Sequence, residues 1–439
     1  MNMDTIAAIS TPLGEGAIGI VRLSGEQALS IALRFFSSST VKTAEDVVPN
    51  HLGLGAFSDG SVREKCMMVY FRAPKSYTGE DMVEFHVHGG AYLAGRVLEA
   101  LLGAGAVLAA PGEFTRRAYL AGKLTLDEAE GVRAMISAES EAELREAYSL
   151  MSGRFDDRIN RLLATLTQVL STMEASLDYP EEMADEADDS MEKAVAVREE
   201  MADLLSSYRA GKLIKGGVTV AIVGKTNVGK SSLLNRLLGY SRAIVSDVHG
   251  TTRDVVGESI VYKGVKINLQ DTAGLRETGD VVEHIGIERS LDAAKGADVV
   301  LYVMEAGHAV DEDELAEIRA FSKKVLLVNN KIDVFGVTEG GINISAKTGE
   351  GVDVLLDEIL RTTALDRRAA ETLTEERHAD CIRRALRSLE EGIAAFKAVN
   401  TECVLVDLRE SIDALSEISG GSATDRIIDD VFSRFCVGK

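Results

Sequence analysis

The fold is decided by a stretch near the middle of the chain, which reads Val218-Thr-Val-Ala-Ile-Val223 and continues directly into Gly224-Lys-Thr-Asn-Val-Gly229-Lys230-Ser231. The first of these runs is β-branched or apolar throughout, as is typical of a strand buried in a parallel sheet. The residues that follow, Ser232-Leu-Leu-Asn-Arg-Leu-Leu238, have the apolar spacing of a helix. A strand, a glycine-rich turn ending in Lys-Ser and a helix, in this order, predict a loop that wraps the phosphates of a nucleotide.

The side chains of this loop suit phosphate and Mg²⁺. Gly224 and Gly229 allow backbone N–H groups to turn inward around phosphate oxygens. Lys230 supplies a positive charge to the β and γ phosphates, and the Ser231 hydroxyl is a ligand for Mg²⁺. We therefore predict nucleotide contacts from Asn227, Val228, Gly229, Lys230, Ser231 and Ser232.

Two later loops determine the predicted specificity for the base. In Asn330-Lys331-Ile332-Asp333, which follows a predicted strand, the Asp333 carboxylate is placed to accept from the ring N–H and the exocyclic amine of guanine. Adenine lacks this pair of donors, and a polar site rejects an analogue that leaves its buried groups unpaired. Ser345-Ala346-Lys347 matches a loop whose backbone N–H groups bind the guanine oxygen. These loops favour GTP over ATP, with predicted contacts from Asn330, Lys331, Asp333, Ser345, Ala346 and Lys347.

Two segments between these loops have the pattern of nucleotide-sensing switches. In Asp271-Thr-Ala-Gly274, Asp271 is expected to bind Mg²⁺ through water, and the Gly274 N–H to sense the γ-phosphate. Thr252 is the expected second hydroxyl ligand of Mg²⁺, beside Ser231. The predicted nucleotide contacts in these segments are Ser246, Asp247, Val248, His249, Gly250, Thr251, Thr252, Asp271, Thr272, Ala273 and Gly274.

The hydrolytic machinery departs from that of small signalling GTPases. Leu275 stands where those proteins carry the Gln that orients the attacking water, and an apolar side chain is unable to orient it. Glu283 and Glu277 are the candidates for this role.

The negative charge that develops on the phosphates also requires a cation. Arg253 is one candidate. The other is a monovalent ion held by the side-chain oxygen of Asn227 and by the backbone carbonyls of Ser246 and Val248.

Length and charge limit the class of protein. With 439 residues, the chain is long enough for two to four domains. A formal charge of −22 argues against bulk coating of nucleic acid, which requires clustered Lys and Arg. The four cysteines lack the spacing of a metal site or a disulfide framework, which fits a reducing compartment. No signal-peptide pattern and no apolar run of roughly 18 residues is found, so we expect a cytoplasmic protein without a membrane span.

Three patterns divide the chain. From Ile6 to about Leu120, short β-type runs and one helical stretch are typical of a compact α+β domain. Helical periodicity covers 124–212 and returns over 386–415. The alternation of strands and helices from Val218 to about Arg361 predicts a parallel sheet covered on both faces. The simplest packing places both helical stretches in one domain, with the α/β domain inserted between them.

The apolar spacing also predicts which helical residues face inward. For the first stretch they are Leu144, Tyr148, Met151, Phe155, Ile159, Leu162, Leu166, Leu170, Met173 and Leu177, and for the second they are Leu386, Leu389, Ile393, Phe396, Leu405, Leu408, Ile412 and Leu415. Between Asp178 and Asp203, eleven acidic residues stand against two basic ones, which favours a solvated helix face or an exposed loop.

Further motifs lie outside the nucleotide loops. They read Asp4-Thr-Ile-Ala-Ala8, Gly19-Ile-Val-Arg-Leu-Ser-Gly25, Tyr77-Thr-Gly-Glu-Asp81, His88-Gly-Gly90, Pro111-Gly-Glu-Phe-Thr115, Gly122-Lys-Leu124 and Phe435-Cys-Val-Gly-Lys439. Together with the nucleotide loops they resemble the MnmE (TrmE) family of tRNA-modifying GTPases, and the likeness covers nearly the whole chain.

The resemblance implies a multidomain α+β and α/β fold. Its parts are an N-terminal α+β domain (1–120) that binds tetrahydrofolate and forms a homodimer, a helical domain (121–215 and 376–439), and an inserted P-loop GTPase domain of the Ras-like type (216–375). It also implies a potassium-dependent GTPase that acts with an FAD-dependent partner, MnmG. Such a pair forms the 5-carboxymethylaminomethyl or aminomethyl group on the wobble uridine of certain tRNAs, using the carbon of 5,10-methylene-tetrahydrofolate.

The resemblance further assigns roles to single residues. It implies folate contacts at Arg22, Glu84, Lys123 and Lys439, potassium ligands at Asn227, Ser246, Val248 and Thr251, and catalytic roles for Glu283, which orients the water, and Cys436, a thiol near the folate. The side-chain chemistry agrees with the folate assignment. Glu84 is suited to a pair of pterin N–H donors, and Arg22 and Lys123 to a carboxylate tail.

Alternatives remain open at three points. Glu84, His86 and His88 alternate on one strand face and suggest a metal site, although three ligands on one strand are poorly placed for tetrahedral geometry. Cys436 is either a small apolar residue at a helix end or a thiol activated by nearby charge such as Lys439. For the whole chain, the alternative is a regulatory or ribosome-assembly GTPase that acts by binding only.

Overall fold

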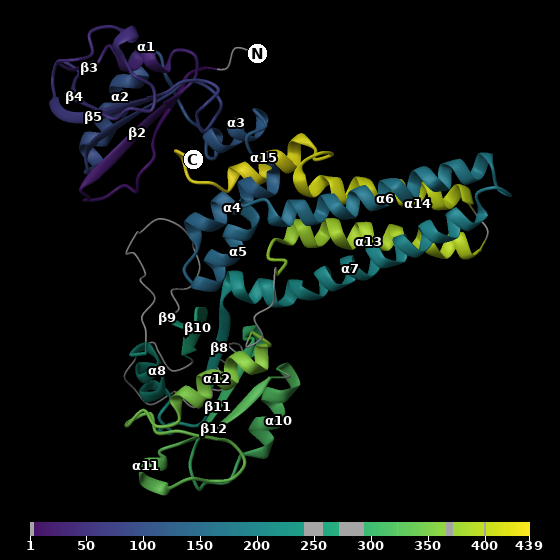
Figure 1. The fold of residues 1–439 in the computed structure, drawn as a ribbon. Coiled ribbons are helices and arrows are strands. Elements are labelled where there is room, and N and C mark those ends of the chain that lie inside the picture. Colours follow the sequence, from purple (N-terminus) through teal and green to yellow (C-terminus); the bar gives the residue numbers. More distant parts are fainter. Residues whose placement is uncertain (1–3, 241–257, 272–293, 323, 366–371, 399–400) are drawn as a thin grey trace. The chain divides into compact units, whose positions relative to one another are not determined.

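A computed structural model shows the fold of the chain (Figure 1). The structure describes residues 4–240, 258–271, 294–322, 324–365, 372–398 and 401–439. The chain forms two compact units, which we call unit 1 (Met1–Arg133 and Ser416–Lys439) and unit 2 (Ala134–Leu415). Within the described residues, no helix has both the length and the apolar character needed to cross a membrane.

Unit 1 is built on one mixed sheet. Its strands are β1 (Ile6–Ile9), β2 (Ile18–Ser24), β3 (Phe36–Ser37), β4 (Gly53–Ser58), β5 (Arg63–Phe71), β6 (Met82–His88) and β7 (Val107–Leu108). They lie in the order β3-β4-β5-β6-β2-β1-β7, and neighbours are antiparallel except for the parallel pair β1 and β7. Its helices are α1 (Ala28–Ala32), the short 3₁₀ helix η1 (Ala44–Asp46), α2 (Ala91–Gly103), α3 (Glu113–Leu120), α4 (Leu126–Ser137), which continues into unit 2, and α15 (Asp425–Ser433).

The two faces of this sheet have different surroundings. Side chains alternate along a strand, so Val21 on β2 and Phe85 on β6 point to the face that forms a buried core with α1 and α2. Arg22 and Glu84 are their neighbours in sequence and therefore lie on the opposite face. The sequence predicts strands over 17–23, 67–71 and 82–87 and a helix over 92–102, and these are confirmed by β2, β5, β6 and α2. It does not predict β1, β3, β4, β7, α1 or α3.

The C-terminal residues pack on unit 1. The core of α4 and α15 is formed by Leu126, Ala129, Ile428, Val431, Phe432 and Phe435. Beyond α15 the chain reaches β1, where Gly438 has φ +95° and a Cβ on it would lie 2.2 Å from the Ile9 carbonyl oxygen. Only glycine fits such an approach of two backbones. The chain end is thereby held beside β1.

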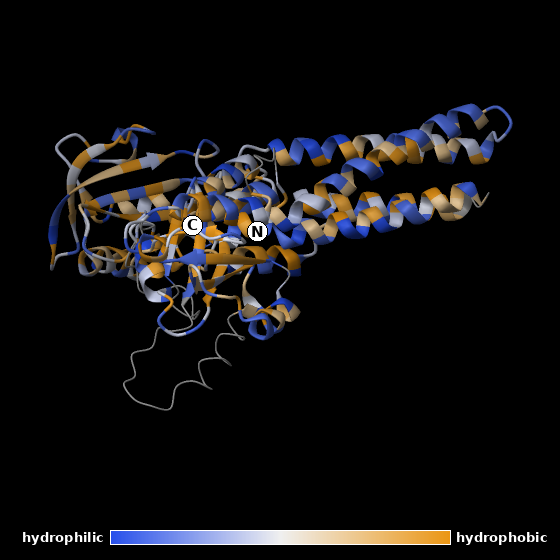
Figure 2. Cartoon of the chain, turned by 90° about the horizontal axis from the view of Figure 1, so that it is seen from below, coloured by the Kyte–Doolittle hydropathy of each residue, from blue (hydrophilic) through white to orange (hydrophobic). Residues whose placement is uncertain are grey.

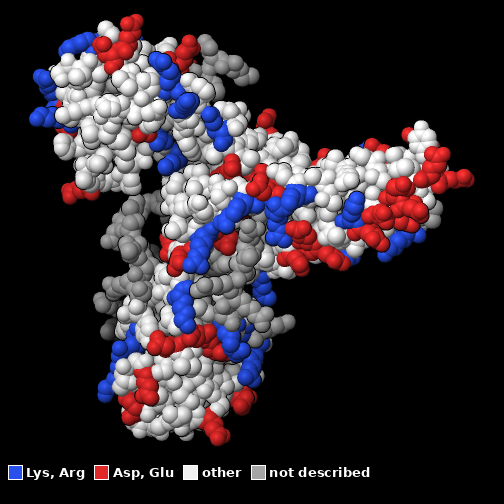
Figure 3. All heavy atoms as spheres, viewed as in Figure 1, with Lys and Arg blue, Asp and Glu red and all other residues white. Residues whose placement is uncertain are grey.

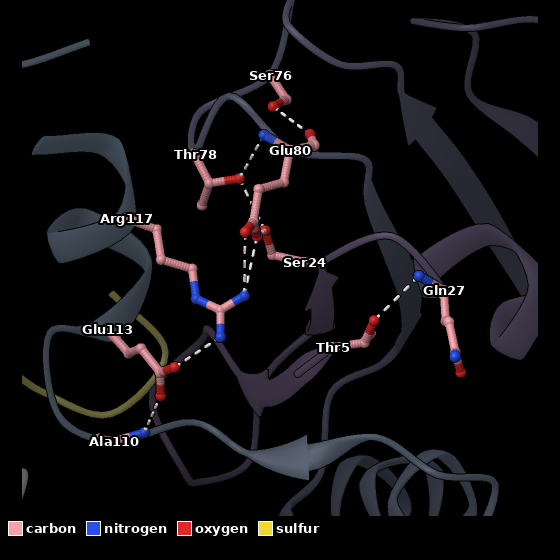
Figure 4. A network of polar contacts seen from close by, with 9 residues as sticks. All are labelled: Thr5, Ser24, Gln27, Ser76, Thr78, Glu80, Ala110, Glu113 and Arg117. Atoms are coloured by element: carbon pink, nitrogen blue, oxygen red, sulfur yellow. Dashed lines mark hydrogen bonds and ion pairs between the residues drawn. The ribbon is translucent and has the colours of Figure 1, made fainter. Parts of the chain in front are cut away.

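A polar network fixes the loop between β5 and β6 (Figure 4). The side chain of Arg117 on α3 is 4% exposed, and it donates to Glu80 Oε2 at 3.0 Å and to Glu113 Oε1 at 2.8 Å. Ser24, at the end of β2, donates from Oγ to Glu80 Oε2 at 2.7 Å. Glu80 is thus bound to both the sheet and α3, and it holds the loop that carries Tyr77.

The helical part of unit 2 contains α5 (Glu141–Met151), α6 (Arg154–Asp178), α7 (Ala184–Gly216), α13 (Glu376–Lys397) and most of α14 (Thr401–Ser419). In Figure 1 the long helices lie side by side, and α7 packs against both α6 and α13. Apolar residues recur along their length in Figure 2. Helices from both sides of the α/β segment therefore pack together, as expected for an inserted domain.

The helical periodicity predicted most of the buried positions correctly, among them Phe155, Ile159, Leu162, Leu166, Met173, Leu389, Ile393, Leu405, Leu408 and Leu415. The prediction is wrong for Leu144, Tyr148 and Leu177, which are 46%, 54% and 43% exposed. For the first two, the reason is a break at Gly153, which has φ +72° and begins a new helix. The apolar period therefore does not continue in phase from α5 into α6.

The acidic segment is confirmed as a solvated helix face. Most of it belongs to α7, whose buried residues in this region are Ala187, Ser190, Met191, Ala194, Val197 and Met201. Asp185, Asp188, Asp189 and Glu192 are exposed. Figure 3 shows acidic side chains gathered along the long helices.

The remainder of unit 2 is the predicted covered sheet. Its strands are β8 (Val218–Val223), β9 (Glu258–Tyr262), β10 (Val265–Asp271), β11 (Val299–Glu305), β12 (Val325–Asn330) and β13 (Ile342–Asn343). Their order is β13-β12-β11-β8-β10-β9, and all pairs are parallel except β9 with β10. Its helices are α8 (Lys230–Leu238), α10 (Glu312–Phe321), α11 (Ile332–Phe335) and α12 (Val352–Thr363). The first and last of these bury their apolar sides on one face of the sheet, and α10 packs on the other.

The Arg117 network leads to a prediction about local stability. Arg117→Met leaves the carboxylates of Glu80 and Glu113 without their shared guanidinium, which we expect to cost about 2–4 kcal/mol of local stability. Amide hydrogen exchange of residues 76–81, measured by mass spectrometry, is expected to become faster.

Arg116→Met is the matched control for this experiment. Arg116 pairs with Asp429 at 2.8 Å, but the two side chains are 43% and 60% exposed, so the loss is expected to stay below about 1 kcal/mol. Equal exchange rates at residues 76–81 in the two variants would contradict the proposed role of the Arg117 network.

Candidate functional site

The phosphate loop has the backbone shape that its sequence predicted. Gly224 has φ +137°, and a Cβ on it would lie 2.2 Å from the Val303 carbonyl oxygen of β11. Gly229 has φ +98° and begins α8, and a Cβ there would lie 2.4 Å from Asn330 Nδ2. Both positions therefore require glycine. The loop ends at the N-terminus of α8, where unpaired backbone N–H groups favour an anion.

Lys230 and Ser231 occupy the first turn of α8. Lys230 Nζ donates to the backbone carbonyls of Gly224 at 2.6 Å and of Lys225 at 2.7 Å, so its ammonium lies across the loop. This arrangement places the positive charge where the predicted phosphates are expected.

A buried amide joins the phosphate loop to the base loops. Asn330, at the end of β12, is 2% exposed. Its Nδ2 donates to the Val228 carbonyl at 2.8 Å, and its Oδ1 accepts from the Ala346 N–H at 3.0 Å. Loops separated by more than one hundred residues in sequence are therefore held by one side chain.

Asp333 is held by the second base loop. Ser345 Oγ donates to Asp333 Oδ1 at 2.7 Å and accepts from the Thr348 N–H at 3.1 Å. This leaves the other carboxylate oxygen of Asp333 without a hydrogen-bond partner among the described residues. The carboxylate is exposed at the loop surface, as a group that binds a ligand must be.

Lys331 connects the base loop to Asn227. Its Nζ donates to the Asn227 backbone carbonyl at 2.8 Å and pairs with Glu305 at the end of β11. The hydrogen bond from Lys331 holds the pKa of Glu305 below its usual value. Asn227 has φ +62°, a conformation that Asn tolerates better than most residues. Its side chain makes no hydrogen bond within the described residues.

The predicted nucleotide-binding residues within 227–232, 330–333 and 345–347 therefore lie close together. The remaining predictions fall on Ser246, Asp247, Val248, His249, Gly250, Thr251, Thr252, Thr272, Ala273, Gly274 and Glu283, which lie outside the described residues, as do Arg253, Leu275, Glu277 and the side chain of Asp271. Their roles stay predictions.

A second group of predicted residues meets on the face of the unit 1 sheet that is opposite to α1 and α2. Arg22 and Glu84 are register partners on β2 and β6. Arg22 donates from Nε and Nη2 to Glu84 Oε1, each at 2.8 Å, and the side chains are 16% and 12% exposed. The guanidinium carbon of Arg22 lies 5.5 Å from the ring centre of Phe114 and 5.9 Å from that of Tyr77. Two aromatic rings and an acid therefore fix this guanidinium in place.

The chain end borders this pair. The Lys439 carbonyl accepts from the Phe114 N–H at 3.2 Å, and the Gly438 carbonyl accepts from Ser10 Oγ at 3.3 Å. Burial, and then the nearby charge of Arg22, lower the pKa of the Lys439 ammonium, while Glu84 opposes the shift. A half-buried cation with a lowered pKa is often found at a functional site.

The other two residues predicted for this site are also placed. Lys123 lies beside the loop of Tyr77, since its Cε would be 3.5 Å from a Cβ on Gly79. Cys436 is exposed and free, and its backbone carbonyl accepts from the Gly112 N–H at 3.4 Å. Cys436 is therefore accessible, and its role stays a prediction.

The two histidines of β6 have different partners. His86 Nε2 lies 3.2 Å from Glu84 Oε2, whereas His88 contacts Glu64 on β5. Within the described residues, no group of three His, Cys, Asp or Glu side chains is arranged to hold a metal ion.

Sequence reasoning missed several residues that shape these sites. Tyr77 and Phe114, which flank Arg22, belong to motifs that the resemblance quoted, but no role was given to them. Glu305 and Arg236 follow no motif, and only the folded backbone brings them to the base loops.

Two solved structures contain segments similar to part of this chain. The G domain of the T. maritima FeoB iron transporter is 27% identical and covers 33% of this chain and 98% of its own, with a TM-score of 0.26. A variant of Aquifex aeolicus Era bound to GDP·AlF4⁻ is 30% identical and covers 39% of this chain and 66% of its own, with a TM-score of 0.27.

Whole-chain comparisons give a specific answer. The family described as GTP-binding protein TrmE N-terminus matches residues 5–123, and the family described as MnmE helical domain matches residues 126–436. The tRNA modification GTPase MnmE of Carboxydothermus hydrogenoformans is 40% identical over 463 aligned positions, which cover 100% of both chains. The protein of the same description from Aquifex aeolicus is 39% identical, over 99% of this chain and 100% of its own. The chain therefore belongs to the MnmE (TrmE) family of tRNA modification GTPases.

Proposed function

We propose that this chain is a potassium-dependent GTPase that acts with an FAD-dependent protein of the MnmG type. Together they form the 5-carboxymethylaminomethyl or aminomethyl group on the wobble uridine of certain tRNAs. The observation that carries this proposal is the cluster of Arg22, Glu84 and Lys439 on the face of the unit 1 sheet that is opposite to α1 and α2. A GTPase that acts by binding only has no need of such a cluster.

Guanine is read by Asp333 and by the loop that begins at Ser345. The hydrogen bond from Ser345 orients the Asp333 carboxylate, which accepts from the ring N–H and the exocyclic amine. The backbone of the loop that begins at Ser345 provides an N–H donor for the guanine oxygen. The side chain of the buried Asn330 binds both this loop and the phosphate loop, and so fixes their relative position.

The cations of GTP hydrolysis are assigned by donor chemistry. Ser231 and Thr252 supply hydroxyl ligands for Mg²⁺, and Asp271 is expected to act through water. Potassium is assigned to Asn227, Ser246, Val248 and Thr251. The support comes from Asn227: its backbone carbonyl is bound by Lys331, but its side-chain oxygen is available to an ion. Glu283 is proposed to orient the attacking water.

The cluster on unit 1 suits a folate. When bound, 5,10-methylene-tetrahydrofolate supplies the one-carbon unit of the modification. Glu84 would accept paired N–H donors of the pterin, and Arg22 and Lys123 would bind anionic parts of the molecule. Lys439, a half-buried cation whose pKa is lowered by burial, would be a further contact for the folate. Cys436 is proposed as the reactive thiol.

The same proposal covers partners and domain boundaries. We assign 1–120 to the folate-binding domain, 121–215 and 376–439 to the helical domain, and 216–375 to the G domain. We also assign homodimer formation to the folate-binding domain. With a net charge of −22, contact with tRNA is local or shared with the MnmG-type partner, in the cytoplasm.

The cation assignment predicts a dependence on potassium. GTP turnover of the wild-type protein is expected to be about tenfold or more faster in K⁺ than in Na⁺ at equal ionic strength, because a cation of the right size neutralises developing charge. Asn227→Ala is expected to remove most of this difference. Equal rates in both salts for the wild-type protein would contradict the assignment.

The folate assignment predicts a binding defect that is separate from GTP hydrolysis. Glu84→Gln removes a charged acceptor, and we expect calorimetry to show about tenfold or weaker binding of a tetrahydrofolate while GTP turnover is unchanged. Glu64→Gln, at the acid that faces His88 on β5, is the matched control with wild-type affinity. Unaltered folate binding by Glu84→Gln would remove this residue from the site.

The activity itself is tested in cells. Deletion of the gene is expected to abolish the modified wobble uridines of bulk tRNA, measured by nucleoside mass spectrometry, and Glu84→Gln is expected to restore them poorly. Unchanged nucleosides after deletion would instead favour the regulatory or ribosome-assembly alternative.

A further inference from the structure

In the loop proposed to bind the guanine oxygen, two of three successive backbone N–H groups are bound by side chains. The Ala346 N–H is bound by Asn330 Oδ1 at 3.0 Å. The Thr348 N–H is bound by Ser345 Oγ at 3.1 Å, and the hydroxyl of Ser345 is bound in turn to Asp333. The Lys347 N–H, between these two, makes no hydrogen bond within the described residues.

Arg236, in the last turn of α8, holds the carbonyl side of the same loop. Its Nε donates to the Ala346 carbonyl at 3.0 Å, and its Nη2 donates to the Lys347 carbonyl. A Cβ on Gly349 would lie 3.6 Å from Nη1, so the guanidinium also packs against the end of the loop. Within the described part of the chain, Arg236 forms no ion pair with a carboxylate.

The geometry of the peptide bond turns these contacts into an orientation. In a trans peptide, the C=O and the following N–H lie in one rigid plane and point in opposite directions. Arg236 binds the Ala346 carbonyl and therefore fixes the plane that carries the Lys347 N–H. The N–H must point away from the guanidinium, as a donor that the loop itself does not use.

Capping of its own helix does not explain the contacts of Arg236. A basic residue in a last turn often caps the carbonyls of its own helix. Arg236 instead directs two nitrogen atoms to the base loop, which is more than one hundred residues away in sequence. It lines one hollow together with Ser232, Asn235, Tyr240, Ala346 and Lys347, so a residue of the phosphate-binding helix and the base loop share a surface.

We propose that Arg236 is a positioning residue for base selection, which orients the Ala346–Lys347 peptide so that the Lys347 N–H meets the 6-oxo group of guanine. The inference rests on the proposed guanine site. It adds a residue that touches neither the base nor the phosphates, yet sets the preference for a 6-oxopurine. It also links the helix that receives the phosphates to the loop that reads the base.

The test uses the full-length protein and three nucleoside diphosphates in competition with a fluorescent GDP analogue. GDP and IDP both carry the 6-oxo group, whereas 2-aminopurine riboside diphosphate lacks it. Arg236→Met retains the aliphatic length but no donor. This variant is expected to bind GDP and IDP more weakly by the same factor, about tenfold. Its affinity for 2-aminopurine riboside diphosphate is expected to fall by less than about twofold.

Two variants complete the test. Arg236→Lys restores one donor and is expected to recover part of the preference for the 6-oxo group, which a role in folding alone does not predict. Arg319→Met, an exposed arginine of α10, is the matched control and is expected to bind all three nucleotides as the wild type does.

The possible outcomes distinguish a failure of the role of Arg236 from a failure of the proposed guanine site. Equal losses for all three nucleotides in Arg236→Met, or no loss at all, would overturn the role of Arg236 while the guanine site stands. A wild-type protein that binds 2-aminopurine riboside diphosphate as tightly as GDP would overturn the guanine site itself.

Discussion

The hydrogen bond from Ser345 to Asp333 is the interaction on which the account of the nucleotide site depends. It holds, at 2.7 Å, the carboxylate that we propose distinguishes guanine from adenine. The bond has this effect only because the loop of Ser345 is itself fixed to the rest of the fold. Asn330 provides one attachment from β12, and Arg236 provides another from α8. Base recognition is therefore a property of several elements, which the parallel sheet of unit 2 brings to one edge.

A comparable constraint shapes unit 1. Its sheet buries one face under α1 and α2, which leaves Arg22 and Glu84 on the other face as a matched pair. The chain end completes this face, since Lys439 is held by a backbone hydrogen bond to Phe114. The aromatic rings and the Arg117 network keep the surrounding loops in place. The chemistry proposed for the folate thus depends on the contacts of Gly438 and Lys439 with Ser10 and Phe114.

The sequence predicted well those features that are encoded locally. The strand, loop and helix around Gly229, the parallel sheet and the exposed acidic face of α7 all follow from spacing within a few residues. Long-range contacts were not accessible in the same way. The bridge made by Asn330 and the bonds of Arg236 each join residues more than one hundred positions apart. The exposed Leu144 and Tyr148 show a related limit, because Gly153 interrupts the helix and shifts the phase of the apolar period.

The most direct test of the central claim is a change of base preference at Asp333. Asn at this position offers an N–H where the carboxylate offers an oxygen, and xanthine carries a 2-oxo group where guanine carries an amine. The relative affinities of XDP and GDP, measured on the wild-type protein and on Asp333→Asn, decide the matter. The account predicts that the variant binds XDP at least about tenfold tighter than GDP, the reverse of the wild type. A variant that still prefers GDP would contradict the claim that Asp333 reads the base.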